Sequence, residues 1–173
     1  MARNLSPRHT LRFHRSCHLS KGGTMFVSDI LTQKGGLVFT VSAGTTVAQI
    51  AQQLSTRRIG AVLVMGVNDE VAGIVSERDL VRAMSLHGAA ALELEARHVM
   101  TREVVTCDPD DSLDLIMEAM TRGRFRHLPV VRHGELLGVV SIGDVVKAQR
   151  DHYQGEVDTL QTQLLAGEGG PAH

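Results

Sequence analysis

The sequence predicts an α+β fold made of two copies of one unit, each with the order strand, helix, strand, strand, helix. Three observations lead to this prediction. Residues 38–65 align with residues 104–131 at an offset of 66, and residues 71–83 align with residues 136–148 at an offset of 65. Short aliphatic runs alternate with amphipathic stretches in both copies. The 173 residues are 43% hydrophobic but only 3% aromatic, so the core must be aliphatic.

Each copy begins with a short apolar run bounded by turn residues, which predicts strands over residues 37–41 and 104–107. A stretch with apolar residues at positions i, i+3, i+4 and i+7 follows each strand, which predicts an amphipathic helix. A side chain suited to an N-cap stands before each helix. The candidates are Thr45 or Thr46 for the first helix and Asp111 or Ser112 for the second.

Two further strands complete each copy as a hairpin. We expect them over residues 60–67 and 71–75 in the first copy, and over residues 127–131 and 136–140 in the second. Pro129 has no N–H to donate, so its strand should lie at a sheet edge or bend at that point.

Short helices should precede the two units, over residues 27–33 and 96–100, and residues 88–95 should link the copies. After Ser141 the last helix should run to about Leu165, ahead of a frayed tail.

The hairpin of each copy ends in a similar motif, GIVSERD at residues 73–79 and GVVSIGD at residues 138–144. This motif resembles the signature of the CBS domain, and FRHLPVV at residues 125–131 resembles the strand that usually precedes it. The resemblance extends over residues 25–150 and is to the stand-alone proteins with two repeats. It divides the chain into a basic, disordered leader (1–24), CBS repeat 1 (25–88), a linker (89–95), CBS repeat 2 (96–150) and a C-terminal helix extension with a tail (151–173).

The resemblance implies a tandem CBS pair in which the two repeats are related by a pseudo-two-fold axis and their small sheets pack together. It also implies two clefts between the repeats. In this family such clefts commonly take AMP, ADP or ATP, and sometimes S-adenosylmethionine or NAD(H). The module senses its ligand and usually does no chemistry on it.

Residue chemistry supports a ribose-binding role for Asp79 and Asp144. One carboxylate can accept hydrogen bonds from both hydroxyls of a ribose, and its charge strengthens them. Both aspartates lie in the first turn of a predicted helix, where the helix dipole favours anions. Ser76 and Ser141 lie three residues earlier and are assigned to the same site. Alternatively, the serines cap the helices and the aspartates merely complement the dipoles.

A bound phosphate group needs cationic side chains, and the sequence offers several candidates for this role. Any one of them could instead be a solvated charge on the surface. The phosphate-binding candidates are Arg58, Arg78, Arg124, Arg126 and His127. Gly143 stands in the second copy where the first has Arg78, so the two clefts should differ in phosphate affinity. By resemblance, strand positions are assigned to adenine binding, although these residues could equally belong to the core of the sheet. These positions are Val38, Thr40, Val41, Val104, Thr106 and Cys107.

Charge and composition argue against several classes of protein. Residues 1–24 hold five basic residues and no acid, which leaves the remaining 149 residues with a formal charge of −6. A net acidic body disfavours general nucleic-acid binding. No stretch approaches the roughly 18–20 uncharged apolar residues of a membrane-spanning helix. Two cysteines 90 positions apart make no disulfide framework, and no secretory signal is evident, which indicates a cytoplasmic setting.

A metal site is not expected. The leader groups side chains that could ligate a metal, but their spacing is irregular and no scaffold surrounds them. They are His9, His14, Cys17 and His18.

The sequence therefore favours a regulatory module that binds adenine nucleotides, lacks catalysis and signals to a partner protein that the sequence does not identify. A structural interaction module with vestigial clefts is the alternative, and a nucleotide-processing enzyme is disfavoured because no catalytic constellation or phosphate loop is evident. We expect a homodimer formed through apolar helix faces left over by the fold. These faces include Leu80, Val81, Met84, Val145 and Val146, with a seam from Tyr153 to Leu164.

Overall fold

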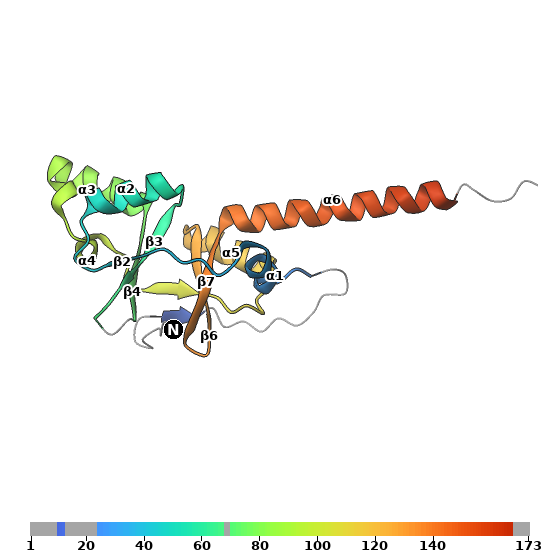
Figure 1. The fold of residues 1–173 in the computed structure, drawn as a ribbon, viewed down its shortest axis with the longest axis horizontal. Coiled ribbons are helices and arrows are strands. Elements are labelled where there is room, and N and C mark those ends of the chain that lie inside the picture. The colour runs from blue at the N-terminus through green and yellow to red at the C-terminus, as the bar shows by residue number, and fades with distance from the viewer. Residues whose placement is uncertain (1–9, 13–23, 68–69, 168–173) are drawn as a thin grey trace, which may run out of the picture.

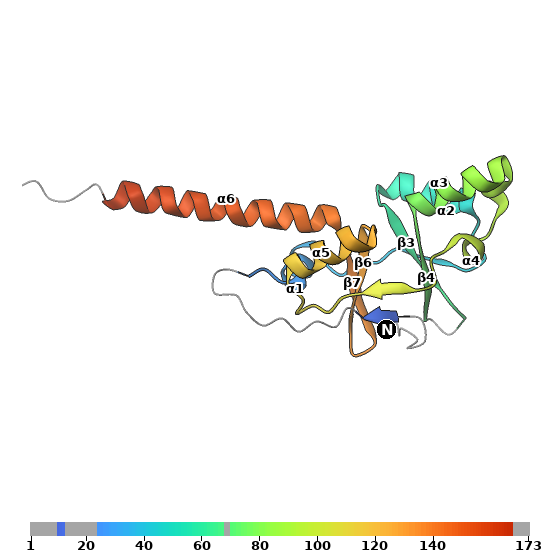
Figure 2. The ribbon, with the colours of Figure 1, turned by 180° about the vertical axis from the view of Figure 1, so that it is seen from behind.

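The computed structural model describes residues 10–12, 24–67 and 70–167 (Figures 1 and 2). A short strand, β1 (Thr10–Arg12), comes first. The first repeat consists of α1 (Val27–Lys34), β2 (Thr40–Ser42), α2 (Val47–Arg57), β3 (Ala61–Met65), β4 (Val71–Ser76) and α3 (Glu77–His87). A 3₁₀ helix, η1 (Gly88–Glu93), leads to the second repeat, which consists of α4 (Ala96–Val99), β5 (Val104–Thr106), α5 (Leu113–Gly123), β6 (His127–Arg132), β7 (Glu135–Ser141) and α6 (Ile142–Gly167).

This order confirms the predicted repeat. The structure also decides between the alternative N-caps. The Thr46 hydroxyl accepts a hydrogen bond from the Gln49 N–H at 3.3 Å, and the Ser112 hydroxyl accepts one from the Leu115 N–H at 3.3 Å. The first strand of repeat 1 is shorter than predicted and begins at Thr40. The last helix continues to Gly167, and residues 168–173 lie outside the described part of the chain.

Pro129 explains why the two repeats differ in their sheets. In repeat 1, β2 pairs in parallel with β3, and the Leu63 N–H donates to the Phe39 carbonyl at 3.0 Å. Pro129 occupies the position equivalent to Leu63 and has no N–H. In repeat 2, β7 is the only labelled strand that pairs with β6, and Cys107 forms an isolated bridge with Val130. β6 therefore lies at the edge of a two-stranded sheet, which is one of the two outcomes predicted for Pro129, whereas the register shift at Val130/Val131 also occurs in β3, at Val64/Met65, and is not due to the proline.

The leader departs from its predicted disorder at three residues. Thr10–Arg12 form β1, which pairs in parallel with β5 and places Leu11 opposite Val105. The leader residues 1–9 and 13–23 lie outside the described part of the chain.

The two short helices each pack into the core of the other repeat. Val27 and Ile30 of α1 are buried in one cluster with Leu113 of α5. Ala96 of α4 is buried in the other cluster with Val47 of α2. The repeats are therefore interlocked, and neither core is complete without a helix from outside its own unit.

The two sheets meet in a third cluster, as predicted. Leu63 and Val71 of repeat 1 are buried against Val131 of repeat 2. Full burial of such aliphatic side chains contributes about 1.5–3 kcal/mol each. This contact holds the two repeats face to face and sets the spacing of the clefts between them.

The helix α6 runs well past the rest of the body (Figure 1). None of the helices in the described part combines the length and apolar composition that a membrane span requires.

Candidate functional site

A cavity of about 440 Å³ contains Asp79 and Ser76 from the start of α3. We call it the first cleft. Its opposite wall belongs to the second repeat, where Val104 and Val105 of β5 supply an apolar surface. The cationic side chains of this wall are Arg124 and Arg126.

A second cavity, of about 350 Å³, contains Asp144 and Ser141 from the start of α6. We call it the second cleft. Its apolar wall comes from the first repeat and includes Phe39, together with the segment from Arg58 to Leu63. In both clefts, an aspartate of one repeat thus faces a strand and basic residues of the other repeat.

Both aspartates use one carboxylate oxygen to cap their helix. The Oδ2 of Asp79 accepts from the Ser76 N–H at 2.7 Å and from the Ser76 hydroxyl at 2.6 Å. The Oδ2 of Asp144 accepts from Ser141 in the same way, at 2.8 and 2.7 Å. Among the described residues, the hydrogen bonds to both carboxylates go to Oδ2, which leaves Oδ1 able to accept further hydrogen bonds. The capping role and a ligand-binding role are therefore compatible.

Lys34 makes the second cleft different. Its ammonium donates to Asp144 Oδ2 at 2.6 Å and to the Val139 carbonyl at 3.2 Å. Burial of the Asp144 carboxylate opposes its ionisation, but hydrogen bonds from Lys34 and Ser141 outweigh burial and lower its pKa below the ordinary value. The second cleft thus holds an ionised carboxylate that already carries a counter-ion.

The predicted phosphate-binding residues all line these cavities. Arg58 and Arg124 occupy equivalent left-handed positions, with φ of 52° and 53°, at the C-terminal ends of α2 and α5. Arg58 lines the second cleft, and Arg124 and Arg78 line the first. The Arg78 guanidinium donates to the Arg124 carbonyl, so it joins the two repeats across the first cleft.

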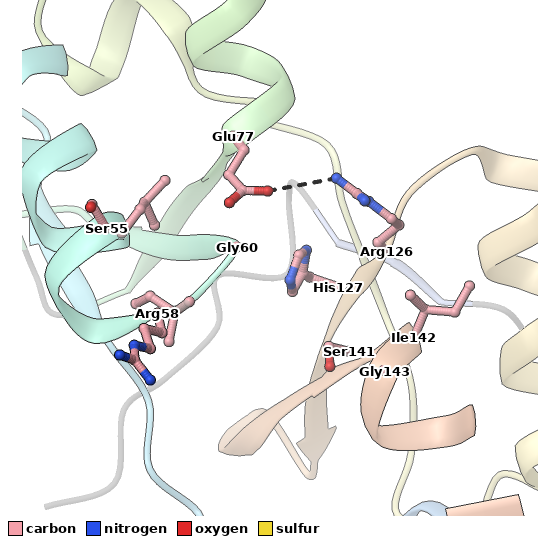
Figure 3. Close-up of a pocket in the computed structure, with 11 residues that line it drawn as sticks. Ser55, Arg58, Gly60, Glu77, Arg126, His127, Ser141, Ile142 and Gly143 are labelled. Carbon is pink, nitrogen blue, oxygen red and sulfur yellow. Dashed lines mark ion pairs between the residues drawn. The ribbon is translucent and has the colours of Figure 1, made fainter. Parts of the chain in front are cut away.

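A third cavity, of about 480 Å³, shares lining residues with both clefts, and we call it the central pocket (Figure 3). Glu77 and Arg126 face each other across it, with their charged atoms 3.7 Å apart. His127 lines the central pocket and both clefts. Burial and the nearby Arg126 lower the pKa of His127 below its ordinary value, which favours a neutral imidazole.

Most of the predicted adenine-binding residues lie elsewhere. Val104 lines the first cleft. Of the other five, Val41, Thr106 and Cys107 are buried in the core, Val38 packs between the sheets, and Thr40 lies outside the three cavities. Burial also raises the pKa of the Cys107 thiol, as expected for a core residue.

Sequence reasoning missed the side chains that form the apolar walls. In the second cleft they include Leu37, Phe39 and Ile59, and in the first cleft Val105 and Phe125. At the offset of 66, Phe39 corresponds to Val105, and Ile59 corresponds to Phe125. Each cleft therefore contains one phenylalanine and one aliphatic residue at these two positions, but the phenylalanine occupies the first position in one cleft and the second position in the other. Strand alternation places Phe39 and Val105 on the opposite face from Thr40 and Thr106, but it does not say which of the two faces lines a cleft.

A scan against protein-family models matches the CBS domain twice, at residues 27–86 and 96–151. The chain is 30% identical over 149 residues to the CBS domain-containing protein CBSX3, mitochondrial, of Arabidopsis thaliana, which covers 82% of this chain and 72% of that protein.

Solved structures with this fold include the CBS-domain containing protein ATU1752 from Agrobacterium tumefaciens, at 44% identity and a TM-score of 0.73. The match covers 77% of this chain and 99% of that one. The CBS domain protein PAE2072 from Pyrobaculum aerophilum, solved in complex with AMP, is 27% identical with a TM-score of 0.61, over 69% of this chain and 89% of that one. With both repeats matched and the repeat architecture observed, the chain belongs to the CBS domain family as a tandem pair.

Proposed function

We propose that the chain is a regulatory module that binds adenine nucleotides in its two clefts and signals their occupancy to a partner protein, without catalysis. One observation carries the proposal. Each cleft is lined by a carboxylate, from Asp79 or Asp144, whose Oδ1 can accept further hydrogen bonds, opposite an apolar wall and basic side chains of the other repeat. A nucleotide offers the matching groups, which are ribose hydroxyls, a flat apolar base and phosphates.

The size and chemistry of the clefts support a nucleotide-sized ligand. Both volumes, about 440 and 350 Å³, fall within the roughly 300–1,000 Å³ of small-molecule sites. Phe39 and Ile59 in the second cleft, and Val105 and Phe125 in the first, can enclose a base. The complex of the Pyrobaculum aerophilum relative with AMP supports the choice of adenine. We therefore propose AMP, ADP or ATP as ligands, with NAD(H) as a further candidate.

Ligand-induced thermal stabilisation tests this function. A ligand that binds only the native state at a hundredfold excess over Kd stabilises it by about 2.7 kcal/mol, a shift of several degrees in Tm. We expect this shift with AMP, ADP or ATP, a smaller one with GMP, and nucleotides recovered unchanged by chromatography. Equal Tm values with and without every adenine nucleotide and NADH would contradict binding, and nucleotide turnover would contradict the regulatory role.

A structural dimerisation module is the second candidate, because apolar side chains are exposed on α3 and α6. Val81 and Met84 are 67% and 51% exposed on α3, and Val146 and Tyr153 are 55% and 62% exposed on α6. Leu80 and Val145, which were predicted to be available for pairing, are instead core residues. We propose a homodimer through the exposed residues. Light scattering at micromolar concentration should give twice the chain mass, and a monomer mass would reject the dimer.

The two candidate functions differ in the expected response to nucleotides. A purely structural module should dimerise without a nucleotide-induced shift in Tm, whereas a sensor should dimerise and show this shift. We also propose a cytoplasmic location, which fractionation of cells that produce the tagged chain can test.

A further inference from the structure

The central pocket shares its basic side chains with both clefts. Arg58 lines the central pocket and the second cleft, whereas Arg126 lines the central pocket and the first cleft. His127 is common to all three cavities. By contrast, Asp79 and Asp144 each line one cleft and not the central pocket. The carboxylates therefore belong to separate sites, whereas Arg58, Arg126 and His127 belong to a common one.

Local packing fixes the positions of the side chains that shape this common region. The Glu77 N–H donates to the Gly60 carbonyl at 3.1 Å, and this bond fixes the start of β3 beside the start of α3. The His127 ring lies against Gly60, where an added Cβ would be 2.8 Å from a ring carbon (Figure 3). Since Arg126 precedes His127 and faces Glu77, one ion pair spans the pocket. An anion entering here would compete with Glu77 for Arg126.

Charge limits what the central pocket can hold. Its described lining contains two arginines, Arg58 and Arg126, one glutamate, Glu77, and His127. A terminal phosphate carries a charge of about −1.5 to −2 near pH 7, so a triphosphate chain brings several negative charges. Two such chains would meet in one pocket with two arginines between them, where the like charges of the chains repel each other.

We propose that the central pocket is one anion site used in turn by both clefts. The pair of clefts then binds two nucleoside monophosphates, whose short phosphates stay in their own clefts, but accepts one nucleoside triphosphate at a time. This inference rests on the proposed function, since it takes the nucleoside to be anchored at Asp79 or Asp144.

Binding stoichiometry measured by calorimetry on the full chain, with AMP and with ATP in magnesium-free buffer, tests the inference. We expect two AMP and one ATP per chain. D79N and D144N each leave one intact cleft and should each still bind one ATP, which shows that both clefts are competent. Equal stoichiometries for AMP and ATP on the unaltered chain overturn the shared site. Failure of both nucleotides to bind overturns the proposed function as well.

Two variants check the residues themselves. R58Q and R126Q should each weaken ATP binding in both clefts by roughly tenfold or more, because charge-assisted hydrogen bonds to phosphate in the shared site are lost, whereas AMP binding should fall only in the cleft that the replaced arginine lines. R122Q is the matched control, because Arg122 pairs with Glu118 on α5 and lines none of the three cavities. A loss of ATP affinity confined to the one cleft that the replaced arginine lines, measured in D79N and D144N backgrounds, would overturn the assignment.

Discussion

Lys34, at the end of α1, holds the carboxylate of Asp144, at the start of α6, through a contact of 2.6 Å between Nζ and Oδ2. Met100 packs its sulfur at Gly73 as Leu31 packs its side chain at Gly138, so Met100 corresponds to Leu31, and Lys34 lies in the part of α1 that extends beyond the shorter α4. No ion pair among the described side chains plays this part for Asp79. The two clefts therefore differ in the charge that their aspartate presents to a ligand.

Replacing Lys34 by Met should strengthen the binding of adenosine in the second cleft. The ammonium competes with ribose hydroxyls for Asp144, and adenosine has no phosphate that could gain from the lysine charge. Measured by calorimetry in a D79N background, adenosine affinity should rise several-fold in K34M. K147M, which removes an exposed lysine of α6, should leave affinity unchanged. Weaker adenosine binding in K34M would show that the lysine assists the ligand. Because the pair is half-exposed, its loss should cost less than about 1 kcal/mol of stability.

His127 should make the stability of the unliganded protein sensitive to acid. Burial and Arg126 lower its folded-state pKa below 6.5, with opposing effects from Glu77 and Asp144. The unfolded chain therefore binds more protons below about pH 6.5, and the free energy of unfolding falls as pH falls through this range. H127Q should lose less stability between pH 7 and pH 5 than the unaltered chain in urea unfolding. H98Q, at an exposed histidine, provides the comparison. Parallel pH profiles for H127Q and the unaltered chain would contradict this account.

The exchange of short helices predicts which fragment of the chain can fold. The core of repeat 1 contains Ala96 of α4, whereas α1 belongs to the core of repeat 2. A fragment of residues 35–102 should show more helix and more cooperative unfolding by circular dichroism than a fragment of residues 24–92. Neither should match the full pair, because a repeat of roughly 60 residues buries only about 60% of its unfolded surface. A better-folded 24–92 fragment would mean that α1 packs on its own repeat.

The pairing of β1 with β5 predicts a local effect of removing the leader. Deleting residues 1–23 frees the outer edge of β5, so amide hydrogen exchange at residues 104–106 should become faster. Exchange in β3 and β4, which pair with each other, should stay the same. The melting temperature should change little, because β1 has three residues. Unchanged exchange at residues 104–106 would show that β1 does not protect this edge.

The sequence predicts the elements of each repeat well because these depend on local signals. Strand runs, amphipathic periodicity and the caps Thr46 and Ser112 lie within a few residues of what they specify. The duplicated Ser and Asp positions also reach the clefts, since both lie where a strand turns into a helix. Pro129 likewise acts locally, since it lacks the N–H that Leu63 donates to Phe39 in repeat 1.

Long-range relationships could not be predicted in the same way. Internal repetition shows that α1 and α4 correspond, but not which core each one enters. The strand near Phe39 is apolar on both faces, so periodicity alone cannot say which face lines a cleft and which one packs in the core. Lys34 and Asp144 are 110 positions apart, and no pattern in the sequence links them.

The most direct test of the account is AMP binding to the D79N/D144N double variant, measured by calorimetry beside D29N. Asp29 caps α1 through the Phe26 N–H at 2.8 Å and lines none of the three cavities, so D29N reproduces the loss of a capping carboxylate without touching a cleft. Hydrogen bonds to a charged group contribute roughly 1.5–3 kcal/mol, so the double variant should bind AMP about tenfold more weakly or worse. D29N should keep the affinity of the unaltered chain, with a modest loss of Tm. Unaltered AMP affinity in the folded double variant would contradict the central claim that Asp79 and Asp144 hold the ribose.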